Sequence, residues 1–164
     1  MPWLNRNRGK WNSMTPTLED AITLATRAHR GQVDKVGQPY ILHALRVMLR
    51  QEDETARIVA VLHDVLEDTH VTLADLRAAG YSEQVRAAVD CLTRREGELY
   101  EAMIERVAAN PLARQVKLAD LADNLDPKRQ IPADSGAAAR HARYEAARNR
   151  LLAEDADDSL PVST

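Results

Sequence analysis

The stretch VLHDVLEDT, residues 61–69, places one imidazole and three carboxylates among apolar residues. Traced back to about residue 54, the same pattern predicts one helix over about 54–67. At about 100° per residue, the four polar side chains fall within an arc of roughly 140°, opposite the apolar ones. These side chains belong to His63, Asp64, Glu67 and Asp68. They could meet at one metal ion, or the polar arc could simply face water, and this segment alone leaves both interpretations open.

The composition of the chain favours helices. Its 164 residues are close to the size of one domain, and they include no phenylalanine and only 4% aromatic residues. The core must therefore consist of Leu, Val, Ile and Ala, of which Leu and Ala are strong helix formers. No segment of useful length alternates apolar and polar residues as a strand does. We predict an all-α fold, a single compact helical bundle.

Capping residues and apolar spacing divide the chain into expected helices and flanking segments. Thr17, Thr72 and Ser82 stand where Ser or Thr begins a helix. The expected helices cover about 18–30, 41–50, 54–67, 73–78, 83–93, 98–109, 111–126 and 137–152, with a loop over 31–40. We expect a folded domain at 17–153, a polar, disordered arm over 1–16 and an acidic tail over 154–164. A contact of the arm with nucleic acid or a partner is the alternative.

The charge and the cysteine content exclude some classes of protein. The formal net charge is -3 at pH 7, so no overall attraction draws the chain to nucleic acid or to a membrane surface. A single cysteine, Cys91, allows no intrachain disulfide and fits a reducing compartment. No apolar run approaches the roughly 18 residues of a membrane span, and no secretory signal opens the chain. We expect a cytoplasmic protein of unknown oligomeric state.

Four separated motifs occur together in this chain. They read AHRGQ at 28–32, GQPYILH at 37–43, LHDVLEDT at 62–69 and VKLAD at 116–120, followed by Asn124. In this order they resemble the HD-domain metal-dependent phosphohydrolases. Within that family the chain is similar to the hydrolase domain of the Rel/Spo stringent-response enzymes and to the stand-alone small alarmone hydrolases. The resemblance covers about residues 18–126 and implies an HD-domain helical bundle.

The resemblance also implies a metal site with two acids beside it. The implied ligands of one divalent ion, usually manganese in this family, are His43, His63, Asp64 and Asp120. Mixed imidazole and carboxylate ligation suits a first-row cation, and zinc is compatible with it. Glu67 and Asp68 resemble the acidic pair that holds or deprotonates the attacking water.

The substrate implied by the resemblance is guanosine tetra- or pentaphosphate. Water would remove its 3′-pyrophosphate and leave GDP or GTP. We assign substrate contacts to Lys35, Lys117 and Asn124, and Tyr100 is a further candidate that could equally pack against the core. Lys117 and Asn124 share a helical face with Asp120, although exposed helices often carry such faces. His29 is expected to be a structural hydrogen-bonding residue and not a fifth ligand.

The loop that should meet the nucleotide differs from the family. It reads Asp34-Lys35-Val36 where the alarmone hydrolases typically carry Arg-Lys-Ser. Asp34 removes a planar cation and would repel a polyphosphate unless it turns away. An alternative is therefore an HD phosphohydrolase acting on another nucleotide, such as a 3′-nucleotide or a 2′-phosphorylated, NADPH-like dinucleotide. A third hypothesis is a non-catalytic nucleotide-binding module, against which the complete set of expected ligands and acids argues.

Overall fold

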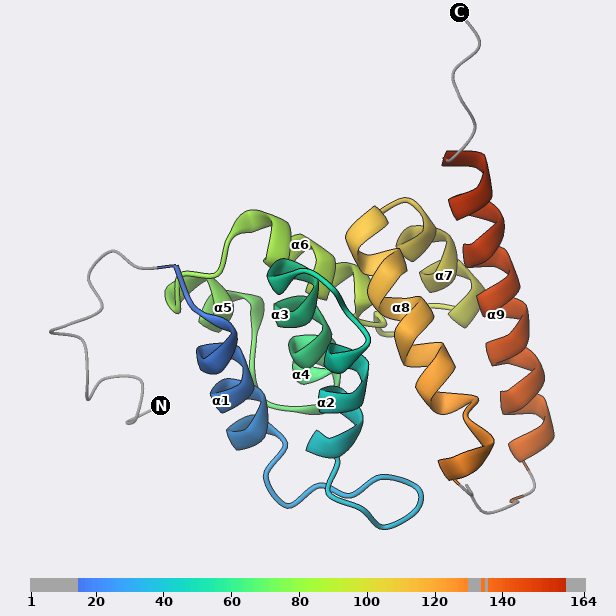
Figure 1. Cartoon of the computed structure of the whole chain (residues 1–164), viewed down its shortest axis with the longest axis horizontal. Coiled ribbons are helices and arrows are strands. Elements are labelled where there is room, and N and C mark those ends of the chain that lie inside the picture. The colour runs from blue at the N-terminus through green and yellow to red at the C-terminus, as the bar shows by residue number, and fades with distance from the viewer. Residues whose placement is uncertain (1–14, 130–133, 135, 159–164) are drawn as a thin grey trace, which may run out of the picture.

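Residues 15–129, 134 and 136–158 are described by the computed structural model (Figure 1). Within these ranges the chain is all-helical, and an isolated bridge between Val33 and Pro39 is the only β pairing. The predicted all-α fold is confirmed. The α-helices are α1 (Leu18–Ala28), α2 (Ile41–Leu49), α3 (Glu54–Leu62), α4 (Val65–Asp68), α5 (Leu73–Ala78), α6 (Glu83–Leu92), α7 (Tyr100–Ala108), α8 (Pro111–Asn124) and α9 (Ala137–Asp158). A short 3-10 helix, η1, covers Pro127–Arg129.

The predicted capping residues begin their helices as expected. The Thr17 hydroxyl accepts a hydrogen bond from the N–H of Asp20, and the Asp20 carboxylate accepts one from the N–H of Thr17. Thr72 and Asp75 form the same reciprocal pair at the start of α5. The Ser82 hydroxyl caps α6. Each such cap stabilises its helix by about 1 kcal/mol.

Helix α3 forms the centre of the domain. It contacts α1, α2, α6 and α8, and its residues 58–62 are all buried. Helices α7, α8 and α9 pack on one another, and the long α9 closes the right-hand side of the domain in Figure 1. Helix α8 contacts α2, α3 and α6 as well as α7 and α9. Side chains of α8 can therefore meet those at the end of α3.

The expectation of one continuous helix over 54–67 is wrong. Helix α3 ends at Leu62, and α4 begins at Val65 after a turn. The His63 imidazole donates a hydrogen bond from Nδ1 to the carbonyl of Ala60 at 2.7 Å. That carbonyl is the one that the N–H of Asp64 would use in a continuous helix, so the side chain competes with the backbone. Asp64 adopts φ -106° and ψ 0°, outside helical values, and the turn redirects the polar side chains that follow it.

Several further boundaries differ from the expected ones. Helix α7 begins at Tyr100 rather than 98. Helix α8 ends at Asn124 rather than 126, because Pro127 cannot continue a helix. Helix α9 extends to Asp158 and so includes the first residues of the expected acidic tail. Residues 1–14 of the expected arm and 159–164 of the tail lie outside the described residues. Within the described part of the chain, no helix is long and apolar enough to cross a membrane.

Candidate metal centre

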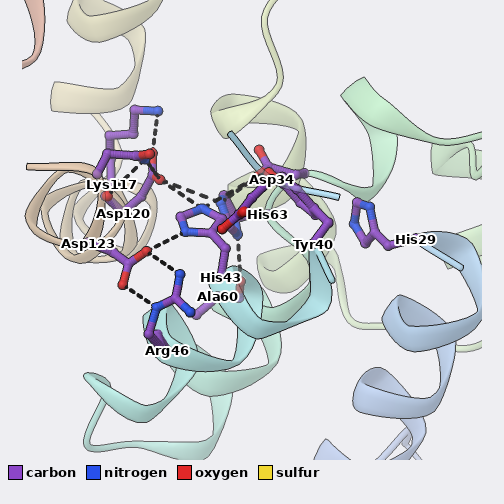
Figure 2. Close-up of polar contacts among 12 residues, drawn as sticks. His29, Asp34, Tyr40, His43, Arg46, Ala60, His63, Lys117, Asp120 and Asp123 are labelled. Carbon is purple, nitrogen blue, oxygen red and sulfur yellow. Dashed lines mark hydrogen bonds and ion pairs between the residues drawn. The ribbon is translucent and has the colours of Figure 1, made fainter. Parts of the chain in front are cut away.

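Two imidazoles and a carboxylate from three helical segments converge inside the domain (Figure 2). His43 lies on α2, His63 follows the last residue of α3, and Asp120 lies on α8. One ligand atom of each lies within 4.8 Å of the others, and all three side chains are buried. The expected ligand Asp64 is close as well, since its Oδ2 lies 2.7 Å from Nε2 of His63 and 3.9 Å from Nε2 of His43. The structure therefore brings all four predicted ligands together.

The hydrogen bond that breaks α3 also fixes the tautomer of His63. A carbonyl can only accept, so the bond to Ala60 requires the proton on Nδ1 and leaves Nε2 with a lone pair when the ring is neutral. This Nε2 atom is buried and has no hydrogen-bond partner among the described residues, although Asp64 is near. In the neutral ring, a buried Nε2 lone pair that faces carboxylate oxygens fits a site for a cation.

His43 is oriented by a carboxylate that the sequence did not indicate as functional. Its Nδ1 donates to Oδ2 of Asp123 at 2.7 Å, so its Nε2 faces Oδ1 of Asp120 at 3.2 Å (Figure 2). Arg46 holds Asp123 with two hydrogen bonds, at 2.7 and 3.1 Å. A carboxylate behind a ligating imidazole is a common feature of metal sites, where it sets the tautomer and ring direction. The spacing of Asp123 three residues after Asp120 was the available signal for it.

Tyr40 is another site residue that sequence reasoning missed. Its hydroxyl donates a hydrogen bond to Oδ2 of Asp64, and its ring lies against His29 with the centroids 4.8 Å apart. The Nδ1 atom of His29 lies 2.7 Å from the Gln32 side-chain oxygen, and the Gln32 amide donates to the carbonyl of Asp68. His29 thus has the hydrogen-bonding role expected of it and lies outside the group of three ligands. The motif GQPYILH contained the available signal for Tyr40.

The pKa values of the cluster show how these charges depend on one another. Burial opposes ionisation of Asp64, but the imidazole of His63 outweighs it and holds the pKa of Asp64 below its usual value. Burial likewise disfavours the charged form of His43, yet Asp120 and Asp123 raise its pKa to about 9. Without a cation, protons on the imidazoles therefore balance the carboxylates. A divalent ion would take over that role and release protons.

Lys117 and Asn124 are both tied to Asp120. The ammonium of Lys117 lies 2.7 Å from Oδ2 of Asp120, and the amide of Asn124 donates to Oδ1 at 2.6 Å. Burial disfavours the charge on Lys117, but Asp120 outweighs this and raises the pKa of Lys117. The amide oxygen of Asn124 accepts from Arg129 at 3.2 Å. The two predicted substrate contacts therefore also orient the carboxylate of Asp120.

The two predicted acids, Glu67 and Asp68, differ in their surroundings. Glu67 accepts a hydrogen bond from the backbone N–H of Arg94 at 2.9 Å. Burial and the charges of Asp64 and Glu67 raise the pKa of Asp68 to about 6. Both acids line the same cavity as His43, Asp64 and Asp120. One acid is thus fixed to the loop after α6, and the other can exchange a proton near neutral pH.

An open cavity of about 400 Å³ adjoins the cluster. All four side chains predicted to contact substrate line it, including Lys35 and Tyr100. Its cationic side chains are Lys35, Arg94, Lys117, Arg129 and Arg143, and they are matched by five carboxylates. A divalent ion would leave this lining with a net positive charge, which suits a polyanionic ligand.

Comparisons with known proteins identify relatives of this chain. A guanosine-3′,5′-bis(diphosphate) 3′-pyrophosphohydrolase of Aquifex aeolicus is 32% identical over 120 residues, 66% of this chain and 17% of that protein. A bifunctional (p)ppGpp synthase/hydrolase RelA of Mycobacterium tuberculosis is 34% identical over 134 residues, 73% of this chain and 18% of that protein. The chain is homologous to a segment of Rel/Spo enzymes. The predicted resemblance is thereby confirmed, although no family model matches.

This homology covers only part of the Rel/Spo enzymes. A GTP pyrophosphokinase of Streptomyces coelicolor is 35% identical over 127 residues, which are 70% of this chain and 15% of that protein. The chain thus spans less than a fifth of the length of these Rel/Spo relatives. A solved structure of a metazoan SpoT ortholog, described as hydrolysing ppGpp, matches with a TM-score of 0.69 and 24% identity over 87% of this chain and 88% of that one. That match confirms the predicted HD-type fold.

Proposed function

We propose that this chain hydrolyses the 3′-pyrophosphate of guanosine tetra- or pentaphosphate, giving GDP or GTP and pyrophosphate. The observation that carries the proposal is the buried convergence of His43, His63 and Asp120 beside a cavity lined by cations. The relatives support the substrate class. The Aquifex protein is described as a guanosine-3′,5′-bis(diphosphate) 3′-pyrophosphohydrolase, and the Mycobacterium protein as a (p)ppGpp synthase/hydrolase.

The metal in this proposal is one divalent ion held by His43, His63, Asp64 and Asp120. The unprotonated Nε2 expected at His63 and the Nε2 of His43, facing Asp120, fit such an ion. The resemblance implies manganese, mixed nitrogen and oxygen ligation suits such a first-row cation, and zinc is the alternative. When bound, the ion supplies Lewis acidity that lowers the pKa of a water molecule.

The acids then have separate roles in the proposed reaction. The Asp68 carboxylate takes the proton of the attacking water, because a pKa near 6 lets it both accept and release a proton at neutral pH. Glu67 holds the loop that carries Arg94 at the cavity and contributes negative charge beside Asp68. Lys35, Lys117, Asn124 and Tyr100 line the space that the nucleotide would occupy.

A second candidate substrate is another phosphorylated nucleotide, of the 3′-phosphate or NADPH-like kind. The presence of Asp34 in the cavity lining favours it, because this acid stands where an arginine is expected. The same metal centre would serve either substrate. A non-catalytic nucleotide-binding module is the remaining alternative, and the complete set of expected ligands and acids argues against it.

One experiment separates these functions. Metal-stripped protein is incubated with guanosine tetraphosphate, with and without added manganese, and the products are separated by ion-exchange chromatography. We expect manganese-dependent release of pyrophosphate and GDP. Phosphate release from 3′-nucleotides or NADPH instead would favour the second candidate, and tight nucleotide binding without product would favour the binding module.

A matched pair of variants tests the site itself. His63→Ala should abolish manganese-dependent turnover, whereas His70→Ala, at an exposed histidine in the same region, should leave it unchanged. Full turnover by the His63 variant would reject the assigned metal centre.

A further inference from the structure

The loop between α1 and α2 carries an acid that pairs with a cation from a distant part of the sequence. Oδ2 of Asp34 lies 2.7 Å from Nη2 of Arg129, the last residue of η1. The two side chains are 5% and 10% exposed, and both line the cavity beside the metal centre. This ion pair joins residues 95 positions apart in the sequence.

Asp34 cannot turn away from the cavity without breaking its own loop. Its Oδ1 accepts hydrogen bonds from the N–H groups of Val36 and Gln38, both at 3.0 Å. Its backbone N–H donates to the carbonyl of Gln38 at 2.8 Å. The carboxylate is therefore fixed by the turn, and its negative charge has to be balanced where it stands.

Arg129 supplies that balance and also ties the loop to α8. Its Nη1 lies 3.2 Å from Oδ1 of Asn124 and 3.2 Å from Oδ2 of Asp123. Asp123 does not depend on Arg129 alone, because Arg46 holds it with two shorter hydrogen bonds. Loss of Arg129 should therefore uncover the charge of Asp34 while leaving His43 in its orientation.

We propose that Arg129 is a specificity-determining positioning residue, which pairs with Asp34 so that a polyphosphate can lie against the loop over 33–39. The proposal rests on the proposed function for the class of ligand, a nucleotide with several phosphates. This pairing accounts for the presence of Asp34 in the loop, because Arg129 of η1 supplies the positive charge at this position of the cavity. The pair acts on charge, so its effect should grow with the number of phosphates on the ligand.

The test measures binding of GTP and GMP to the full chain in excess manganese by titration calorimetry. These nucleotides lack the 3′-pyrophosphate that the proposed reaction would remove. We expect Arg129→Gln to weaken GTP binding at least about tenfold and GMP binding less than about threefold. Asp34→Asn, which keeps the Oδ1 acceptor of the turn, should bind GTP no more weakly than the unmodified chain. The double variant should return to within about threefold of it.

Three control variants separate charge from folding. Arg129→Lys keeps the positive charge and should hold GTP binding within about threefold of the unmodified chain. Lys128→Gln, at an exposed neighbour in η1, should change nothing. Arg143→Gln removes a different cation of the cavity and should also weaken GTP binding. Adding Asp34→Asn to this variant should not restore binding, because Asp34 pairs with Arg129. Manganese affinity should stay within about threefold of normal in Arg129→Gln, since Arg46 still holds Asp123.

Several outcomes would overturn the proposal. They are equal losses for GTP and GMP, no recovery in the double variant, a tenfold loss of manganese affinity, or no GTP binding by the unmodified chain. Failure of the proposed function looks different: guanosine tetraphosphate would not be hydrolysed, while the pattern of GTP binding among the variants would persist.

Discussion

Oδ2 of Asp123 lies 2.7 Å from Nδ1 of His43, and both side chains are buried. Arg46 and Arg129 contact the same carboxylate. Since Nδ1 donates to Asp123, the lone pair of the neutral ring is on Nε2, on the side of Asp120. A residue with no expected role in the chemistry therefore decides which nitrogen of His43 is available.

This relationship predicts the effect of Asp123→Asn. The amide weakens the preference for a proton on Nδ1 and leaves the two arginines without their shared anion. We expect manganese affinity to fall by about 10- to 100-fold, as for other groups that orient ligating histidines. Electron paramagnetic resonance of free manganese measures it. Asp90→Asn, at a partly exposed acid paired with Arg95, is the matched control and should bind manganese normally.

The raised pKa of His43 predicts a pH dependence of the metal-free protein. A histidine whose pKa rises from 6.5 to about 9 on folding contributes stability that is fully present below pH 6.5 and is lost as the pH rises through 9. The melting temperature of metal-stripped protein should therefore fall over this interval. Saturating manganese should flatten the decline, because the ion takes the place of the proton. A melting temperature that rises with pH in metal-stripped protein would contradict the assignment.

Substitution of the two acids should separate their roles. Asp68→Asn removes the proposed proton acceptor, so we expect kcat for guanosine tetraphosphate to fall by about 10²- to 10⁴-fold with manganese binding preserved. The acid limb of the pH–rate profile should disappear with it. Glu67→Gln keeps an acceptor for the N–H of Arg94 and should lose less. A larger loss in the Glu67 variant than in the Asp68 variant would reverse the roles.

Two adjacent leucines test the packing of α9. Leu151 is fully buried, whereas Leu152 is 48% exposed. Leu151→Ala should lower the free energy of unfolding by about 2–5 kcal/mol, because it leaves a cavity between packed helices. Leu152→Ala should change it by less than about 0.5 kcal/mol. Urea denaturation followed by circular dichroism gives both values, and similar effects for the two variants would mean that α9 does not pack as described.

Much of the fold and of the site could be predicted because the information was local. Thr17, Thr72 and Ser82 begin helices through side chains three residues from their partners. The four ligand candidates stand in motifs that identify them without any knowledge of distances. Tertiary pairs were not accessible in this way. Asp123 meets Arg46, 77 residues away, and Asp34 meets Arg129, 95 residues away. Nothing in the sequence indicates which of the many charged residues form these pairs.

The break in α3 illustrates a different limit. Periodicity treats residues 54–67 as one helix, because it counts apolar positions and ignores what a side chain can do to the backbone. The Nδ1 proton of His63 competes for the carbonyl of Ala60, and the helix ends there. Helical spacing thus selected side chains that do lie near one another and gave the wrong geometry for Asp64.

One hydrogen bond, from His63 to Ala60, ends a helix and chooses the nitrogen that faces the other ligands. Folding alone therefore immobilises the ring, and no ion is needed for it. The loss of rotational freedom belongs to folding rather than to binding, so a cation would meet an imidazole that is already fixed in place. Metal selectivity would then come from the fixed spacing of these atoms more than from rearrangement around each ion, and ions of unsuitable radius should be held weakly.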